Sequence, residues 1–225
     1  MKSALDVLLS LPLFNGASTQ KIQQVIGKHK FHFLKFTDGE PLIAAGDSCT
    51  HIRFVISGKV RSWIESDDGR IKVSQTLAAP NVIAPEFFFG RTTSYPCSVK
   101  ALGTAGIVDI EKNEFLRIIE SDPVFLFNYL NLLSVDAQQS LQGVMCLTSG
   151  DLRKRIAYWI LALTQRGGSD IVMECRQRDL YTVFGVPRQS LMAALTDMRL
   201  EGAITFDPGT IRVESRDELV RILRQ

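Results

Sequence analysis

The spacing of hydrophobic side chains changes along the chain from helical to strand-like and back to helical. Residues 3–28 place apolar residues at helical intervals, with a loop at Asn15-Gly16. Short runs rich in β-branched and aromatic residues then predict strands over residues 31–36, 52–56, 60–64, 71–74 and 107–110. Turn signals such as Asp38-Gly39 and Ser57-Gly58 separate these runs, so the pattern predicts an antiparallel sandwich or barrel.

A long helical pattern follows, from about Pro123 to Leu147. Its apolar residues recur at alternating steps of four and three, which is the spacing of a coiled-coil seam. The seam positions are Leu126, Leu130, Leu133, Ala137, Ser140, Val144 and Leu147. Apolar residues beside the seam can pack on the strands, namely Phe125, Tyr129, Leu132 and Leu141. The pattern favours a homodimer seam with Ser140 as its polar position, and a helix packed only on its own strands is the alternative.

The last third of the chain returns to short helices and ends in a hairpin. The sequence breaks the long helix at residues 148–151, and a new helix is predicted for residues 152–165. Two further helices, between Gln177 and Ile204, meet at the tight turn Gly185-Val186-Pro187. A strand pair about Pro208-Gly209 comes next. This order predicts a winged helix–turn–helix, with an ordinary helical hairpin as the alternative.

The second of those two helices has a buried and an exposed face. The buried stripe is made by Leu191, Ala194, Leu195 and Met198. The opposite face carries Gln189, Met192, Ala193 and Thr196, with Arg188 and Arg199 near its two ends. A helix that begins Arg-Gln-Ser on its exposed side suits insertion into the major groove of DNA.

Charge permits nucleic-acid binding without establishing it. The 225 residues carry a net charge of +2. Residues 1–149 hold 14 basic and 14 acidic side chains, whereas residues 150–225 hold 12 basic and 10 acidic side chains. Eleven of those 12 basic residues are arginine, which suits bidentate contacts to phosphate and guanine.

Composition argues against several other classes of protein. A hydrophobic fraction of 45% is typical of a globular chain with a core. No stretch approaches the roughly 20 apolar residues of a membrane span, and the N-terminal residues lack the features of a signal peptide. We therefore expect a cytoplasmic protein with no membrane partner. The cysteines are too scattered to predict a disulfide framework or a metal cluster; they are Cys49, Cys97, Cys146 and Cys175.

Motifs for catalysis and metal binding are also missing from the sequence. His29 and His32 lie three residues apart on a predicted strand, so they point to opposite faces and cannot hold one metal ion. The sequence contains no nucleophile elbow, P-loop, zinc spacing or metalloprotease motif. Neither a catalytic residue nor a metal site is predicted.

The segment DGEPLIAAGDSCTHIRFVISGKV carries glycines at positions 39, 46 and 58, with an acidic residue after each of the first two. It resembles the opening hairpins of the cyclic-nucleotide-binding jelly roll in the cAMP receptor protein (Crp/Fnr) family. The order of parts is also that family's, and the resemblance runs from about residue 20 to 213. It implies an α+β fold with a β-roll sensor domain (1–122), a dimerisation helix and hinge (123–149) and a winged helix–turn–helix (150–225). The glycines are expected at turns with positive φ, with Gly58 ending a hairpin.

The resemblance also implies which residues contact DNA. Arg188 stands where the family's recognition helix places a guanine-reading arginine. Gln189 replaces a glutamate of many members, and Ala193 replaces a second arginine of the best-known members, so the operator is expected to differ from the familiar half-site. Phosphate contacts are expected from Ser190, Gln177, Arg178 and Arg153. Taken singly, each arginine could instead be a solvated surface charge.

The effector region departs from the family pattern. Cyclic-nucleotide binders of the family carry Gly-Glu-Leu followed by Arg-Ser-Ala, which hold the ribose and the cyclic phosphate. Here Ala84-Pro85 replace Gly-Glu, and Tyr95-Pro96-Cys97 replace Arg-Ser-Ala. An unpaired buried phosphate is costly, so we expect no cAMP binding in the family manner and predict no cofactor. The candidate pocket, which holds another effector or is filled by its phenylalanines, comprises Phe87, Phe88, Gly90, Arg91, Tyr95, Cys97 and Ser140.

These features together predict a homodimeric, sequence-specific DNA-binding transcription regulator of the Crp/Fnr type. It is expected to respond to an effector other than cAMP or to be active without one. The expected partners are a double-stranded DNA operator and a second copy of the chain, with RNA polymerase as a further candidate. The alternative is an effector-sensing or scaffold module of the same fold that lacks specific DNA recognition.

Overall fold

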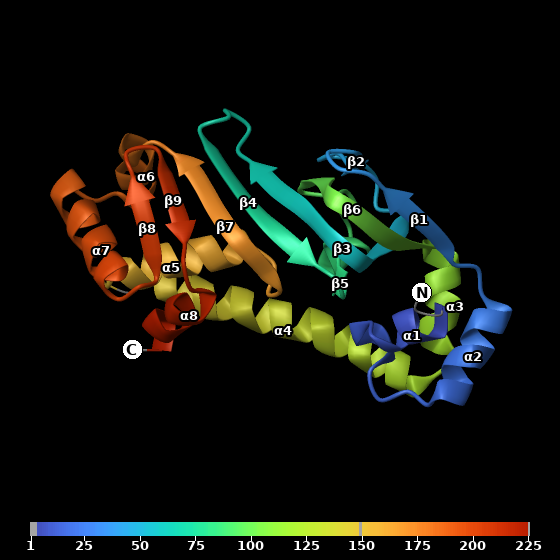
Figure 1. Ribbon diagram of the computed structural model, residues 1–225. Coiled ribbons are helices and arrows are strands. Elements are labelled where there is room, and N and C mark those ends of the chain that lie inside the picture. Colours follow the sequence, from blue (N-terminus) through green and yellow to red (C-terminus); the bar gives the residue numbers. More distant parts are fainter. Residues whose placement is uncertain (1–3, 149, 225) are drawn as a thin grey trace. The chain divides into compact units, whose positions relative to one another are not determined.

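The computed structural model describes residues 4–148 and 150–224, apart from the side chains of residues 139, 143, 146 and 147 (Figure 1). The chain forms two compact units. The first contains residues 1–61 and 77–137, and the second contains residues 62–76 and 138–225. The second unit is therefore built from two stretches of chain that are far apart in sequence.

Antiparallel strands dominate the first unit, as the sequence predicts for a jelly roll. The strands that begin in it are β1 (His32–Phe36), β2 (Pro41–Ile43), β3 (His51–Glu65), β5 (Asn81–Val82) and β6 (Ser98–Glu111), and β4 (Ile71–Ala78) ends in it. β6 lies between β1 and β3. β1 pairs with β6 from His32 opposite Asp109 to Phe36 opposite Ala105, and β2 pairs with the earlier part of β6.

β3 is one continuous strand, which shows that the predicted turn at Ser57-Gly58 is wrong. It includes both predicted runs, 52–56 and 60–64. Gly58 has a φ of +71°, and a Cβ at this position would overlap the backbone oxygen of Thr104. The glycine therefore permits a close approach of two strands rather than a reversal of the chain. Gly39 and Gly46 also have positive φ, as predicted.

Helices of the first unit supply much of its core. They are α1 (Ala4–Leu9), η1 (Pro12–Phe14), α2 (Thr19–Lys28), η2 (Pro85–Phe87), α3 (Lys112–Glu120) and the first part of α4 (Pro123–Leu147). Phe14 packs edge to face on Phe125 of α4, with ring centroids 5.1 Å apart. Phe115 of α3 meets Phe88 at 5.4 Å and Tyr129 of α4 at 5.2 Å. These aromatic contacts place Phe125 and Tyr129, which are both buried, in the core of the first unit.

The second unit contains the predicted winged helix–turn–helix. Its elements are α5 (Leu152–Ala162), β7 (Gly168–Cys175), α6 (Gln177–Phe184), α7 (Arg188–Leu200), β8 (Ile204–Asp207), β9 (Thr210–Val213) and α8 (Arg216–Arg224). β7 pairs antiparallel with β9, and β9 pairs with β8. β4 lies along the other edge of β7, so the strand order is β4-β7-β9-β8 (Figure 1). The part of β4 up to Thr76 thus belongs to this unit.

Candidate nucleic-acid interface and effector region

The turn between α6 and α7 depends on two residues with restricted or unusual backbone angles. Gly185 ends α6 in the left-handed conformation, with φ +62°, and its N–H donates to the carbonyl oxygens of Tyr181 and Thr182. Pro187 precedes α7 with φ −60°. Arg155 of α5 holds the end of α6, because its Nη2 donates to the Phe184 carbonyl at 2.7 Å. The predicted tight turn is thereby confirmed, and Arg155 is a contributor that the sequence pattern did not reveal.

The buried stripe of α7 fixes which of its faces is free. Leu191, Ala194, Leu195 and Met198 are at most 6% exposed. Burial of each leucine contributes roughly 2 kcal/mol. The helix is thus held by this side, as predicted. Arg188, Gln189, Ser190 and Ala193 are exposed. These four residues lie in the first two turns of α7, and we call them together the α7 reading face.

The N-terminus of α6 lies close to the wing. The backbone N–H of Gln177 donates to the Pro208 carbonyl at 3.4 Å, and Arg178 is exposed. Arg176, the N-cap residue, makes no side-chain cap hydrogen bond. The first turn of a helix presents N–H groups and a partial positive charge, which together favour phosphate. Gln177 and Arg178 are therefore placed where a phosphate contact is possible.

Arg153 is committed to protein contacts. Its Nη1 lies 2.7 Å from Glu201 Oε1, at the end of α7, and its Nη2 lies 3.1 Å from Asp151 Oδ2, at the N-cap of α5. A guanidinium between two carboxylates links α5 to α7. In this arrangement Arg153 supports the position of α7, and the phosphate contact expected from the sequence stays a prediction.

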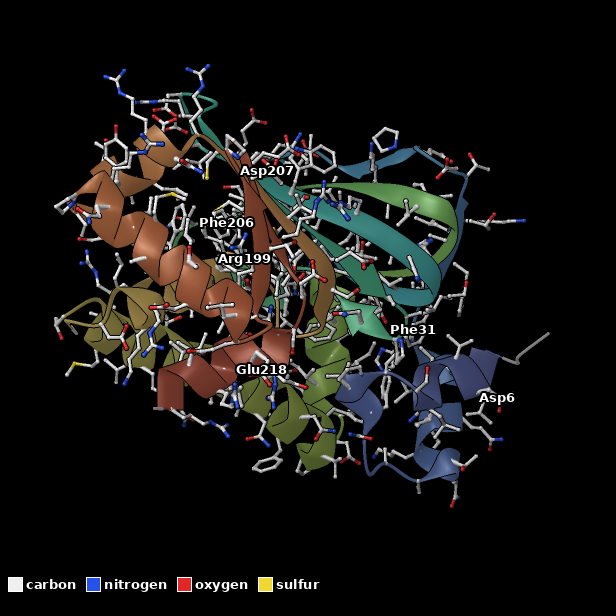
Figure 2. All side chains as sticks on the ribbon, turned by 60° about the vertical axis from the view of Figure 1, so that its left-hand side comes forward. Asp6, Phe31, Arg199, Phe206, Asp207 and Glu218 are labelled. Atoms are coloured by element: carbon white, nitrogen blue, oxygen red, sulfur yellow. The ribbon has the colours of Figure 1, made fainter. Side chains whose placement is uncertain are left out.

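Arg199 lies near the C-terminal end of α7, beside the wing. Figure 2 shows its side chain next to Phe206 of β8, and the guanidinium carbon is 5.2 Å from the centre of that ring. A cation over an aromatic face gains up to about 1 kcal/mol at an exposed site. This stacking contact, which the sequence pattern did not predict, joins α7 to the wing.

Six of the seven predicted effector residues belong to the first unit, and their exposure differs. Phe88, Tyr95 and Cys97 are buried, whereas Gly90 and Arg91 are exposed and Phe87 is half-buried. The Tyr95 hydroxyl donates to the His51 carbonyl at 2.8 Å, and burial raises the pKa of Tyr95 above its ordinary value. Tyr95 is thus already bonded within the protein. Ser140 belongs to the second unit, where its carbonyl accepts a hydrogen bond from Tyr158 at 3.2 Å.

A partly buried ion pair that the sequence pattern did not reveal lies next to Tyr95. Arg53 Nε is 3.4 Å from Asp109 Oδ1, and its guanidinium carbon is 5.8 Å from the centre of the Tyr95 ring. Arg53 Nη1 also donates to the Leu42 carbonyl at 3.1 Å. The nearby thiol of Cys49 is buried, and burial raises its pKa to about 11. Asp109 Oδ1 is buried and, among the described residues, has no hydrogen-bond partner, so its attraction to Arg53 is electrostatic.

A small cavity of about 10 Å³ lies between the roll and α4 within the first unit. Its lining includes Ile52, Phe54, Val82, Tyr129 and Leu132. A space of this size holds about one water molecule. Lys112 Nζ lies over the rings of Phe88 and Phe89, at 4.9 and 5.6 Å, and these rings fill part of the unit's interior. In this conformation, this cavity is too small for a nucleotide.

α4 exposes most of its predicted seam. Leu126, Leu130 and Val144 are 41%, 52% and 56% exposed, and Ala137 and Ser140 are also exposed. Leu133 is half-buried, and the side chain of Leu147 lies outside the described residues. Three neighbouring apolar residues, Phe127, Leu141 and Met145, are more than 60% exposed, so the prediction that Leu141 packs on the strands is wrong. Among the described helices, none is both long and apolar enough to cross a membrane.

Comparison with known families matches both units. The model of the cyclic nucleotide-binding domain matches residues 33–122, and that of the Crp-like helix-turn-helix domain matches residues 154–222. The cyclic AMP receptor protein of Thermus thermophilus is 24% identical over 207 residues, which cover 90% of this chain and 92% of that protein. A CRP-like cAMP-activated global transcriptional regulator of Mycobacterium tuberculosis is 20% identical over 225 residues, 97% of this chain and 99% of that protein.

A similar fold is present in a solved structure. The crystal structure of the Thermus thermophilus catabolite activator protein matches with a TM-score of 0.55 and 22% identity, covering 95% of this chain and 98% of that one. At this identity the match supports the fold. It agrees with the β-roll, the long helix and the winged helix–turn–helix described above.

Proposed function

The chain belongs to the Crp/Fnr family of transcription regulators, and on this basis we propose that it reads a specific DNA operator as a homodimer through the α7 reading face. The observation that carries the proposal is the orientation of α7. Its buried stripe leaves Arg188, Gln189, Ser190 and Ala193 free at the helix N-terminus. That end of a recognition helix is the one that meets base edges in the major groove. Gln177 and Arg178 would hold phosphates beside it.

Arg188 is the residue whose loss should change sequence preference most. Selection from random duplexes by the wild-type protein should yield a pseudo-palindromic consensus with half-sites about 34–36 Å apart. Arg188→Ala should then lose discrimination at one position of each half-site, at a cost of about 1–3 kcal/mol. Arg117→Ala, which removes an exposed arginine from α3 of the first unit, is the matched control and should leave the consensus unchanged. A wild-type selection without any consensus would support the alternative of a scaffold module that does not recognise specific DNA.

The exposed apolar stripe of α4 supports dimerisation. Leu126, Leu130 and Val144 repeat at coiled-coil spacing and are exposed in the single chain. A contiguous apolar surface of this kind is typical of an interface with another protein. A second copy would cover each stripe with an identical one and would supply two α7 reading faces for a two-fold symmetric operator. RNA polymerase is a further candidate partner once the dimer is on DNA.

We propose that the effector, if the protein uses one, is not cAMP bound in the manner of the family. Tyr95 stands where the resemblance places the phosphate-pairing arginine, and its hydroxyl is bonded to His51. Ala84 replaces the family's glycine and has a φ of +44°, a left-handed conformation that favours glycine. Arg91, the nearest candidate substitute for the arginine, is exposed. Calorimetric titration should detect no cAMP binding, and micromolar binding that Arg91→Ala abolishes would contradict this.

A further inference from the structure

The hairpin of residues 62–76 is part of the second unit, although the flanking parts of β3 and β4 belong to the first. Its β4 strand lies against β7 (Figure 1). Ser74 Oγ donates to the Val172 carbonyl at 3.4 Å, and the Gln165 backbone N–H donates to Gln75 Oε1 at 2.9 Å. Val73, 3% exposed, joins the apolar core of the winged helix–turn–helix. The β4 strand of the hairpin is thus the fourth strand of the sheet β4-β7-β9-β8, which we call the wing sheet.

Most of the buried polar residues in the described part of the chain lie in this hairpin. Among the described residues, six polar or charged residues are buried, and four of them belong to the hairpin: Ser62, Ser74, Gln75 and Thr76. Surfaces that stay together permanently are mostly apolar, whereas surfaces that separate carry more polar groups. Hydroxyl and amide groups can exchange their protein partners for water when a strand leaves. The composition of the hairpin is therefore that of a strand that can detach.

The hairpin tip lies beside the N-terminus of α6. Arg70 Nη1 is 3.9 Å from Asp179 Oδ1 of α6. An open groove of about 320 Å³ is lined by residues of the tip, of the end of β7 and of the segment after it, among them Glu65, Arg70, Lys72, Glu174 and Arg176. The tip (residues 65–72) carries three exposed carboxylates, those of Glu65, Asp67 and Asp68, and two basic side chains, Arg70 and Lys72, and Arg70 pairs with Asp68. Docking of the hairpin thus brings a net charge of −1, with Glu65 and Asp67 as the carboxylates outside the Arg70–Asp68 pair, to the region where DNA phosphates are expected.

We propose that residues 62–76 form a detachable fourth strand of the wing sheet, and that the docked hairpin lowers the affinity of the protein for DNA. The inference rests on the proposed DNA binding through α6 and α7. Repulsion between the tip carboxylates and the DNA phosphates weakens DNA binding in the docked form. Detachment of the hairpin removes this repulsion. β3 and β4 continue directly into the first unit, so a change there can reach the DNA-binding surface through the hairpin itself.

Gly168 offers a way to release the hairpin with a single methyl group. A Cβ at this position would overlap Oε1 of Gln75, which accepts the hydrogen bond from Gln165. Gly168→Ala should therefore displace the Gln75 side chain and weaken docking. Gly150→Ala is the matched control, since a Cβ there meets open space. Asp67→Asn removes tip charge from an exposed position and leaves docking in place, with Glu120→Gln in the first unit as its control for net charge.

Hydrogen exchange measured by mass spectrometry on the full-length protein tests docking without DNA. Segments 62–76 and 168–175 should exchange about tenfold faster in Gly168→Ala than in the wild type, because one hydrogen bond of the docked strand is lost. Segment 204–213 should be unchanged. Unchanged exchange in both hairpin and β7 would overturn the proposal. Equal acceleration in segment 204–213 would also overturn it, because the whole unit would then be opening.

Binding to a random-sequence duplex at fixed salt tests the effect on affinity. Gly168→Ala and Asp67→Asn should each bind about threefold to tenfold tighter than the wild type, and both controls should match the wild type. Equal or weaker binding by these two variants, with the wild type still binding, would overturn the inference and leave the proposed function intact. If none of the proteins bound random or selected duplexes, the proposed function would fail as well, and the exchange result would still decide docking.

Discussion

Gly185 carries the turn that orients the α7 reading face. Its φ of +62° lies in the left-handed region, and a Cβ at this position would meet open space. The requirement for glycine is therefore one of backbone conformation alone. A side chain in this region brings Cβ close to the following carbonyl oxygen.

Gly185→Ala should lower the free energy of unfolding of the second unit by about 1–2 kcal/mol because of this backbone strain. Denaturant unfolding followed by circular dichroism would measure the change. Gly27→Ala in α2 is a control of opposite sign, because Gly27 is a helical residue with open space around it. It should stabilise the protein by about 0.5–1 kcal/mol. Equal effects from the two substitutions would contradict the role of the left-handed turn.

Arg53 and Asp109 form a pair in which either charge would destabilise the fold if the other were removed. Asp109 is 8% exposed, and its closest charged neighbour is Arg53. Removing one member of a buried pair leaves an uncompensated charge, whereas removing both does not.

Asp109→Ala should therefore cost about 3 kcal/mol of stability, and Arg53→Met/Asp109→Ala should cost clearly less than the single change. A double-mutant cycle of thermal or denaturant unfolding measures the coupling between the two side chains. Additive costs would show that the pair does not stabilise the roll.

Residue patterns predicted the apolar side of the site better than its polar contacts. The stripe from Leu191 to Met198 follows from helical periodicity, so the exposed side of α7 could be assigned before the structure. The pairing of Arg153 with Glu201 spans 48 residues of sequence, and that of Arg53 with Asp109 spans 56. Periodicity within one element carries no information about such partners, so neither pair could be predicted from the sequence.

At the scale of elements, α4 combines two packing surfaces on one helix. Phe125 and Tyr129 are buried in the core of the first unit, whereas Leu126 and Leu130 are exposed. Their spacing on adjacent faces explains why a single helix can pack on its own unit and still present an apolar stripe.

Leu130→Glu should prevent dimerisation, because a charge would face its own copy in the middle of an apolar seam. Sedimentation equilibrium should give twice the 25.1 kDa chain mass for the wild type and the chain mass for the variant. Asn131→Glu adds the same charge at the next exposed position and should leave the dimer intact. A monomeric wild type would contradict the seam, whatever the variants do.

The order of elements was predictable, and one strand boundary was not. The long helix, the two short helices and the wing follow from periodicity and from turn residues such as Pro208-Gly209. Gly58 has the same local signature as a turn glycine, yet it lies within β3 because a strand passes too close for a side chain. Only the neighbouring strand distinguishes these two uses of glycine, and it lies elsewhere in the sequence.

At the scale of the whole molecule, several carboxyl groups make the free energy of unfolding depend on pH in the acidic range. Hydrogen bonds from Ser66 and Arg70 lower the pKa of Asp68 to about 2. A hydrogen bond from His29 lowers the pKa of Glu114, and the Val124 backbone N–H lowers that of Asp122. Each folded-state pKa lies below its unfolded value, so the folded protein binds fewer protons than the unfolded chain in acid.

The stabilisation that these groups contribute should therefore be fully present and constant above about pH 5, and it should be lost as the pH drops from about 4 toward 2. Denaturant midpoints measured in steps from pH 6 to pH 3 would follow this loss. His29→Ala should make the loss of stability in acid smaller. Glu114 then lacks the hydrogen bond that lowers its pKa, so its folded-state pKa returns toward the unfolded value. A midpoint that stayed constant down to pH 3 would contradict the argument.

The fourth strand of the wing sheet also constrains how the protein can form. Ser74 is separated from Val172, its partner in β7, by 98 residues, so the ribosome adds β7 about 5–20 s after the hairpin at ordinary rates of synthesis. Until then the β4 edge of the hairpin lacks its strand partner, and unpaired edges favour association between chains. The polar side chains of residues 62–76 let water solvate this unpaired β4 edge until β7 has been synthesised. The same composition that would let the hairpin detach thus also protects the nascent chain.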